Sequence, residues 1–130
     1  MQNRRPAAPL PRVLVVEDEP AVRDLLARML EALGFAVDAA PTGWQGLLRL
    51  QAEPDAFRVV VLDLGLPDGP GTRLLDTLHA RWPGLPVLVL TGRAERPAGA
   101  DAFLQKPFDL SELAASVRSL VGAADLAGAR

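Results

Sequence analysis

The sequence predicts an α/β fold, a doubly wound five-stranded parallel sheet with the flavodoxin-like strand order 2-1-3-4-5. Short apolar runs rich in valine and leucine alternate along the chain with segments whose apolar residues follow helical spacing. The run Arg58–Leu64 is apolar at nearly every position, which is typical of a strand buried on both faces. Because parallel strands need crossover connections, the alternation favours right-handed strand–helix–strand units.

The 130 residues fit one domain with a short segment at each end. Residues 1–11 contain three prolines and are predicted to form a disordered leader. Residues 12–121 form the predicted folded domain. Residues 122–130 are rich in alanine and glycine and are predicted to be a flexible tail.

The first half of the domain predicts two strand–helix pairs. A strand over Arg12–Glu17 is followed by Pro20, which suits the first turn of a helix. Gly34 is placed to end that helix. A second strand leads to a second helix, which begins with a capping box made by Thr42 and Gln45.

The second half continues the alternation with one exception. The Arg58–Leu64 strand leads to a third helix, a fourth strand over Val87–Thr91, a fifth strand over 102–106 and a last helix capped by Asp109. The interval 91–100 holds two glycines and a proline, whereas a crossover with its helix usually needs at least about 10–12 residues. We therefore expect the fourth helix to be short or absent and this interval to exchange its amide hydrogens quickly.

Composition excludes several classes of protein. The absence of cysteine excludes disulfides and thiolate metal sites and agrees with a cytoplasmic location. The longest apolar runs are far too short to span a bilayer, so no membrane partner is expected. A net charge of −2 gives no electrostatic footprint for nucleic acid, so no direct nucleic-acid partner is expected either.

Polar side chains follow the predicted strands at the point where each strand ends. Glu17 and Asp18 follow the first strand, Asp63 the third, Thr91 the fourth and Lys106 the fifth. The carboxyl ends of parallel strands meet at one edge of a sheet, here beside the switch point between the first and third strands. We therefore expect these five side chains to converge.

Such a cluster predicts a metal-dependent phosphoryl chemistry. Neighbouring carboxylates repel one another unless a cation compensates, and Mg²⁺ prefers oxygen ligands. The predicted ligand atoms belong to Asp18, Asp63, Glu17 and the backbone carbonyl of Gly65. A carboxylate beside Mg²⁺ can attack a phosphoryl donor to form an aspartyl-phosphate, whose oxygens Lys106 and Thr91 would bind.

Four short motifs together resemble the receiver domain of two-component response regulators. They read Val-Val-Glu-Asp-Glu-Pro at 15–20, Val-Leu-Asp-Leu-Gly-Leu-Pro at 61–67, Leu-Thr-Gly at 90–92 and Phe-Leu-Gln-Lys-Pro-Phe at 103–108. Each motif alone is weak, but four in this order at successive strand ends are specific. The resemblance covers about residues 12–121.

The resemblance implies a role for each site residue. Asp63 would be the phosphoacceptor, which receives its phosphoryl group from a histidine kinase or a histidine phosphotransfer protein. Asp18 would bind Mg²⁺ directly and Glu17 through water. The domain would catalyse only its own Mg²⁺-dependent phosphorylation and dephosphorylation and would not otherwise be an enzyme.

The resemblance also implies a conformational switch. Thr91 would be the switch hydroxyl, Phe103 the aromatic residue that reorients behind it, and Lys106 the partner of the phosphate. The Lys106–Pro107 bond is expected to be cis, which only a bond before proline readily allows. Arg93 and Gly65 would line the mouth of the site and tune the access of water.

Two other functions fit parts of the pattern. A pseudo-receiver would act only as a protein–protein interaction module, but all five site residues are present. A phosphatase with an aspartyl nucleophile would need a second Asp where Gly65 stands. The short fourth-helix interval argues against the dimer typical of DNA-binding regulators and resembles receivers of hybrid kinases or stand-alone receivers. His79, Arg23 and Arg49 are interpreted as solvent-facing helix residues.

Overall fold

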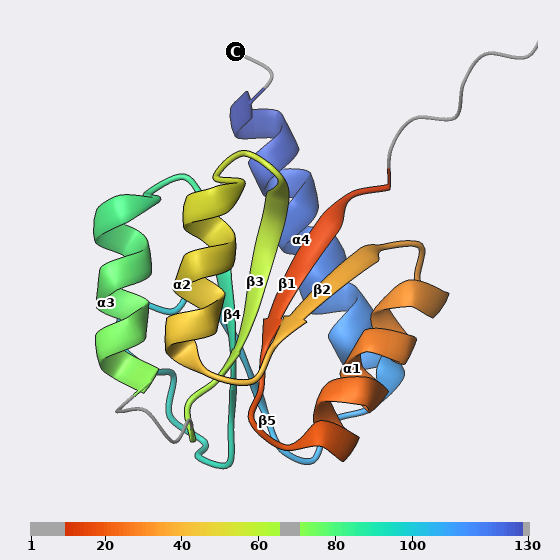
Figure 1. Cartoon of the computed structure of the whole chain (residues 1–130). Helices are drawn as coiled ribbons and strands as arrows, with labels where there is room; N and C mark the ends of the chain where they lie inside the picture. Colours follow the sequence, from red (N-terminus) through yellow and green to blue (C-terminus); the bar gives the residue numbers. More distant parts are fainter. Residues whose placement is uncertain (1–9, 66–70, 129–130) are drawn as a thin grey trace, which may run out of the picture.

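The computed structural model describes the backbone of residues 10–65 and 71–128 and, within these ranges, the side chains of residues 10–65 and 72–122. Its sheet has five strands: β1 (Arg12–Val16), β2 (Ala36–Ala40), β3 (Phe57–Asp63), β4 (Val87–Thr91) and β5 (Ala102–Gln105). All neighbouring strands are parallel, in the order β2-β1-β3-β4-β5 (Figure 1). The predicted flavodoxin-like sheet is confirmed.

Helices cover both faces of the sheet. They are α1 (Pro20–Ala32), α2 (Gly43–Ala52), α3 (Gly71–Arg81) and α4 (Leu110–Gly128). In Figure 1, α2 and α3 lie on one face and α1 and α4 on the other. Each face has its own core, with Leu50 and Leu75 among the helix residues of the first and Leu30 and Leu113 among those of the second.

Strand β3 lies at the centre of the sheet, paired with β1 on one side and β4 on the other. Its residues Val59–Leu62 are fully buried, since alternate side chains enter the two cores. Helix α2 approaches the sheet closely, because a Cβ at Gly46 would lie 3.0 Å from Cγ2 of Val16. This rigid centre fixes the position of Asp63, the last residue of β3.

The local signals in the sequence form as predicted. Pro20 is the first residue of α1, and Gly34 follows the helix with a φ of +97°, a conformation that favours glycine. The Thr42 hydroxyl accepts a hydrogen bond from the Gln45 backbone N–H (3.1 Å). The capping box of α4 is reciprocal: Asp109 accepts from the Glu112 N–H, and Glu112 accepts from the Asp109 N–H.

The structure agrees with the sequence prediction at the connection between β4 and β5 and differs from it at the end of α4. No helix forms between β4 and β5, so the described part of the chain has four helices and the predicted loss of the fourth crossover helix is confirmed. Helix α4 runs to Gly128, past the end that its apolar pattern predicts at Val121. The Lys106–Pro107 bond is cis, as expected. Residues 66–70 and residues 1–9 of the predicted leader lie outside the described residues.

None of the helices in the described ranges has the length and apolar character needed to cross a membrane.

Candidate functional site

An open pocket of about 930 Å³ lies at the carboxyl ends of the strands. It brings together five of the residues predicted from the sequence, namely Asp18, Asp63, Gly65, Thr91 and Lys106. The three strands β3, β4 and β5 hold their ends together through backbone hydrogen bonds, including one of 2.7 Å from the Lys106 N–H to the Thr91 carbonyl. The convergence predicted from the strand ends is therefore present in the structure.

Polar groups are buried at this edge and nowhere else among the described side chains. The buried polar or charged residues are Glu17, Asp63 and Thr91, which are 2%, 8% and 5% exposed. A buried polar group is costly unless it is paired, so a protein keeps one where its chemistry is needed. The burial pattern thus makes this pocket the candidate functional site.

Three carboxylates form the acidic part of the pocket. Glu17, Asp18 and Asp63 each offer an oxygen, and these oxygens lie within 4.8 Å of one another. Oε2 of Glu17 accepts a hydrogen bond from the Glu19 N–H (3.2 Å), whereas the buried Oε1 has no hydrogen-bond partner. Burial raises the pKa of Glu17 to about 7, and the neighbouring carboxylates of Asp63 and Asp18 act in the same direction.

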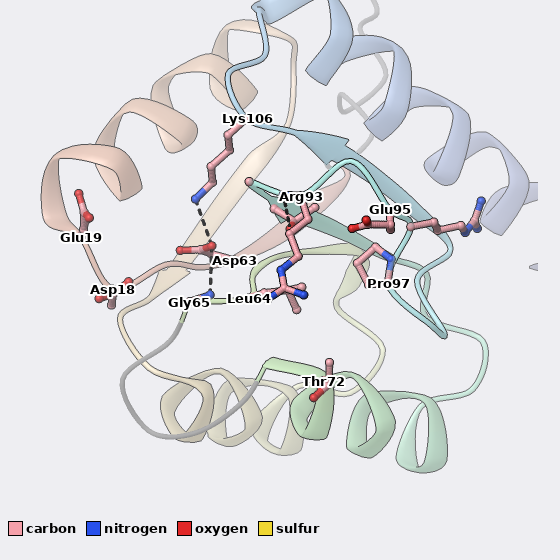
Figure 2. A pocket seen from close by; sticks show the side chains of 13 residues that line it. Asp18, Glu19, Asp63, Leu64, Gly65, Thr72, Arg93, Glu95, Pro97 and Lys106 are labelled. Carbon is pink, nitrogen blue, oxygen red and sulfur yellow. Dashed lines mark hydrogen bonds and ion pairs between the residues drawn. The ribbon is translucent and has the colours of Figure 1, made fainter.

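The lysine opposes this negative charge at one point. Nζ of Lys106 lies 3.1 Å from Oδ1 of Asp63, and the two side chains point toward one another in Figure 2. The same Oδ1 also accepts a hydrogen bond of 3.3 Å from the Gly65 N–H. These two bonds fix the orientation of the Asp63 carboxylate. One cation against three carboxylates leaves the cluster short of positive charge.

The predicted switch residues occupy different surroundings. Thr91 lines the pocket, and its Oγ1 accepts a hydrogen bond from the Arg93 N–H (3.1 Å). Phe103 is half-buried and packs against the core that α2 and α3 cover; it is not among the residues that line the pocket. The structure therefore places Thr91 in the site and Phe103 behind it, in the adjacent core.

Arg23 supports the acidic loop, a contact that the sequence interpretation missed. Its guanidinium donates hydrogen bonds to the backbone carbonyls of Glu17 (3.1 Å) and Asp18 (3.3 Å). Arg23, interpreted from the sequence as solvent-facing, is half-buried and makes these two contacts in the structure. Helix α1 begins only three residues before Arg23, so the side chain can reach back over the loop that precedes the helix.

The segment between β4 and β5 forms the outer wall of the pocket. Arg93, Glu95, Arg96 and Pro97 line it, and Figure 2 shows Arg93 extending toward the side of the pocket where Leu64 and Thr72 lie. Arg96 anchors the segment by donating to the carbonyls of Ala100 (2.6 Å) and Asp101 (2.8 Å). These side-chain hydrogen bonds satisfy backbone carbonyls that a helix would otherwise satisfy with its own N–H groups. No periodic pattern in the sequence predicts them.

Comparison with known proteins agrees with this geometry. Residues 13–118 match the family described as response regulator receiver domain. The chain is 43% identical over 114 residues to the KDP operon transcriptional regulatory protein KdpE of Escherichia coli, with 82% of this chain and 49% of KdpE covered. It is 36% identical over 126 residues to the DNA-binding dual master transcriptional regulator RpaA of Synechocystis, with 89% and 51% covered.

A solved structure of a response regulator is also similar to this chain. The response regulator protein TrrA of Thermotoga maritima, in complex with Mg²⁺-BeF, superposes with a TM-score of 0.78 at 28% identity and covers 85% of this chain and 99% of its own. The chain spans about half the length of the curated relatives named above. The expectation that there is no nucleic-acid partner therefore stays a prediction about these 130 residues.

Proposed function

Because this chain belongs to the response regulator receiver domain family, we propose that Asp63 is the residue that accepts its phosphoryl group. The chain is a phosphoacceptor receiver of two-component signalling. The observation that supports Asp63 is its position: it is the acid that Lys106 contacts, it ends the central strand, and it belongs to the three-carboxylate cluster. The carboxylates of Asp18 and Glu17 share the cluster, but neither is ion-paired with a cationic side chain among the described residues.

The donor set of the pocket fits a divalent cation. Three carboxylates, one of which carries the unpartnered Oε1 of Glu17, form a group of hard oxygen ligands that one lysine does not neutralise. We assign the direct ligands to Asp18, Asp63 and the carbonyl of Gly65, with Glu17 behind them acting through water. A bound Mg²⁺ would neutralise charge on the incoming phosphoryl group.

The remaining residues supply binding and orientation. A carboxylate oxygen of Asp63 attacks phosphorus, the P–N bond to the donor's imidazole breaks, and its electron pair stays on the nitrogen. Lys106 releases part of its contact with Asp63 to bind a phosphoryl oxygen, and the Thr91 hydroxyl donates to another. Hydrolysis reverses the outcome when water attacks the same phosphorus. The chain thereby catalyses its own phosphorylation and dephosphorylation.

The phosphodonor is proposed to be a histidine kinase or a histidine phosphotransfer protein. The pocket is open rather than enclosed, and Asp18, Arg93 and Thr72 stand at its accessible rim. A protein-bound phosphohistidine can therefore approach Asp63 from solvent. When Thr91 binds the phosphoryl group, we expect Phe103, the second proposed switch residue, to change its position as well.

The pseudo-receiver alternative has no supporting observation. Such a module needs neither buried acids nor a lysine directed at one of them, yet both are present. Retaining an uncompensated acidic cluster lowers stability, so its presence is better explained by a chemical role.

Intact-mass spectrometry after incubation with acetyl phosphate and Mg²⁺ tests the assignment. Wild type is expected to gain one phosphoryl group and Asp63→Asn none. Asp38→Asn, which changes an acid outside the pocket, serves as the matched control and should be labelled like wild type. An unmodified wild type or a labelled Asp63→Asn protein would overturn the proposal.

A further inference from the structure

The only histidine of the chain contacts the segment that replaces the missing crossover helix. We call residues 92–101 the pocket loop, because five of them line the pocket at the carboxyl ends of the strands. Nε2 of His79, near the end of α3, is hydrogen-bonded to the carbonyl of Gly99 and lies 3.9 Å from Oδ2 of Asp101. His79, interpreted from the sequence as a solvent-facing helix residue, therefore has partners in the pocket loop.

Packing brings the end of the pocket loop against α3 at the same place. Ala100 is buried in the core that contains Leu75 and Leu78 of α3. Gly99 has a φ of +84°, and a Cβ there would lie 3.6 Å from Cδ2 of His79 and 3.7 Å from Cδ2 of Leu75. The turn thus presents its carbonyl to His79 in a backbone conformation that favours glycine.

The charge around the imidazole makes this contact sensitive to protonation. A carbonyl only accepts hydrogen bonds, so Nε2 must carry the hydrogen that Gly99 receives. A second proton on Nδ1 leaves that bond intact and adds attraction to the Asp101 carboxylate. Arg96, which binds the Ala100 and Asp101 carbonyls, also brings charge to this turn, and Asp76 precedes His79 by three residues on α3.

Asp101 passes the contact to the sheet. Its Oδ2 accepts a hydrogen bond of 2.8 Å from the Val87 N–H, and its own N–H donates to the Val87 carbonyl (3.2 Å). His79 therefore contacts the C-terminal end of the pocket loop, which Asp101 attaches to β4. The N-terminal end of the same loop directly follows Thr91. From these contacts we propose that His79 is a positioning residue that holds the pocket loop against α3 more firmly when the imidazole is protonated.

The consequence is a pH-dependent outer wall of the pocket. Imidazole groups as a class change their charge near neutral pH, so the test compares a mildly acidic pH with a mildly basic one. The link to phosphoryl transfer rests on the proposed function of Asp63. The positioning itself does not, and it can be measured on the unphosphorylated chain.

Amide hydrogen exchange of the full chain at pH 6 and pH 8 tests the proposal, with rates corrected for intrinsic exchange. Loop amides of wild type are expected to be protected at both values and roughly threefold more protected at pH 6, the scale of a partly exposed ion pair. In His79→Gln, whose amide can still donate to Gly99, protection should remain but lose its pH dependence. In His79→Ala, protection should fall at both values.

Two further measurements separate this contact from general destabilisation. Asp101→Asn keeps an acceptor for Val87 but lacks the charge, so its loop should also be insensitive to pH. The exchange of β3 amides should be the same in wild type and His79→Gln. A pH dependence in His79→Gln equal to that of wild type would overturn the proposal. So would unchanged loop protection in a folded His79→Ala protein. Failure of Asp63 labelling would leave all these exchange results unaffected.

Discussion

Two acidic clusters in this domain have opposite electrostatics. Asp38 and Glu53 contact two arginines: Arg12 and Arg49 both contact Asp38, and Arg12 also lies 2.9 Å from Glu53. Among the described residues, the carboxylates of the pocket cluster, Glu17, Asp18 and Asp63, form a single ion pair, between Asp63 and Lys106. The first cluster joins β1, β2 and α2 as structural support, whereas the second keeps charge available for a ligand.

The pKa values follow the same division. Burial opposes the charge of Asp38, but hydrogen bonds from Arg49 and Arg12 outweigh it and lower the pKa of this carboxyl. Burial of Glu17 has no such compensation, so its pKa rises to about 7. Similar residue types thus stabilise the fold in one place and weaken it in the other. This is the pattern expected where function is retained at a cost in stability.

The largest expected effect comes from neutralising one acid in each cluster. Glu17→Gln should raise the free energy of unfolding at pH 8 without Mg²⁺, by at most about 3 kcal/mol for a shift from 4.5 to about 7. The new amide can also donate to the neighbouring carboxylates. Asp38→Asn should lower the free energy of unfolding by roughly 1 kcal/mol, because two arginines lose a charged acceptor.

Urea unfolding of the two variants and wild type measures these changes. Both variants replace one carboxylate with the corresponding amide, so each serves as the control for the other. If both changes destabilise the protein, the pocket cluster is not strained in the absence of metal, and the comparison drawn above fails.

The pH profile of stability should show the same contrast. The folded state holds a proton on Glu17 between pH 4.5, the unfolded value, and about 7. The contribution of protonated Glu17 to the free energy of unfolding is fully present below pH 4.5 and is lost as the pH rises through about 7. Asp38 acts with the opposite sign: its stabilisation is present above its ordinary pKa of 3.8 and is lost as the pH falls through the lowered value.

Subtracting the profile of Glu17→Gln from that of wild type isolates the first group. The free energy of unfolding of wild type should fall relative to the variant between pH 4.5 and about 7. A difference that is flat across this window would show that Glu17 is ordinarily ionised in the folded protein.

Much of the site follows from the sequence because one rule of topology connects distant residues. The strand ends at Asp18, Asp63, Thr91 and Lys106 are separated by up to 88 positions in the sequence, yet parallel pairing brings them to one edge. Local signals could also be predicted, since a cap or a helix-ending glycine acts within a few residues. Strand-end residues and capping residues therefore account for the predicted fold and for the side chains that meet in the pocket.

The contacts that the sequence did not predict lack such a rule. Arg49, interpreted as solvent-facing, pairs with Asp38 on β2, and His79 contacts a carbonyl twenty residues away in an irregular loop. Their partners depend on side-chain geometry across elements rather than on periodicity. The expectation of fast exchange in the pocket loop likewise ignored Arg96, whose hydrogen bonds give a physical reason to expect partial protection.

Metal binding sharpens the comparison within the pocket cluster itself. Asp18 lines the pocket and is partly exposed, while Glu17 lies buried behind it. Asp18→Asn should weaken Mg²⁺ binding by roughly a hundredfold and Glu17→Gln by roughly tenfold, the lower end expected for a group that supports a ligand. Calorimetric titration with Mg²⁺ compares the two, and Asp38→Asn should match wild type. Equal losses in Asp18→Asn and Glu17→Gln would contradict the ranking.

The smallest expected effect concerns the exposed arginine at the pocket mouth. The Arg93 backbone N–H binds Thr91, and its side chain extends over the open side of the pocket (Figure 2). Replacing the side chain leaves the backbone bond and admits water, so Arg93→Ala should shorten the lifetime of phosphorylated Asp63 by about two- to fivefold, the scale of an exposed charge. Mass spectrometry over time after removal of acetyl phosphate measures the lifetime. Arg93→Lys separates charge from bulk, and Arg28→Ala on α1 is the control for losing an arginine elsewhere. An unchanged or longer lifetime in Arg93→Ala would show that this side chain does not shield the pocket, so the difference between the clusters would lie wholly in their buried acids.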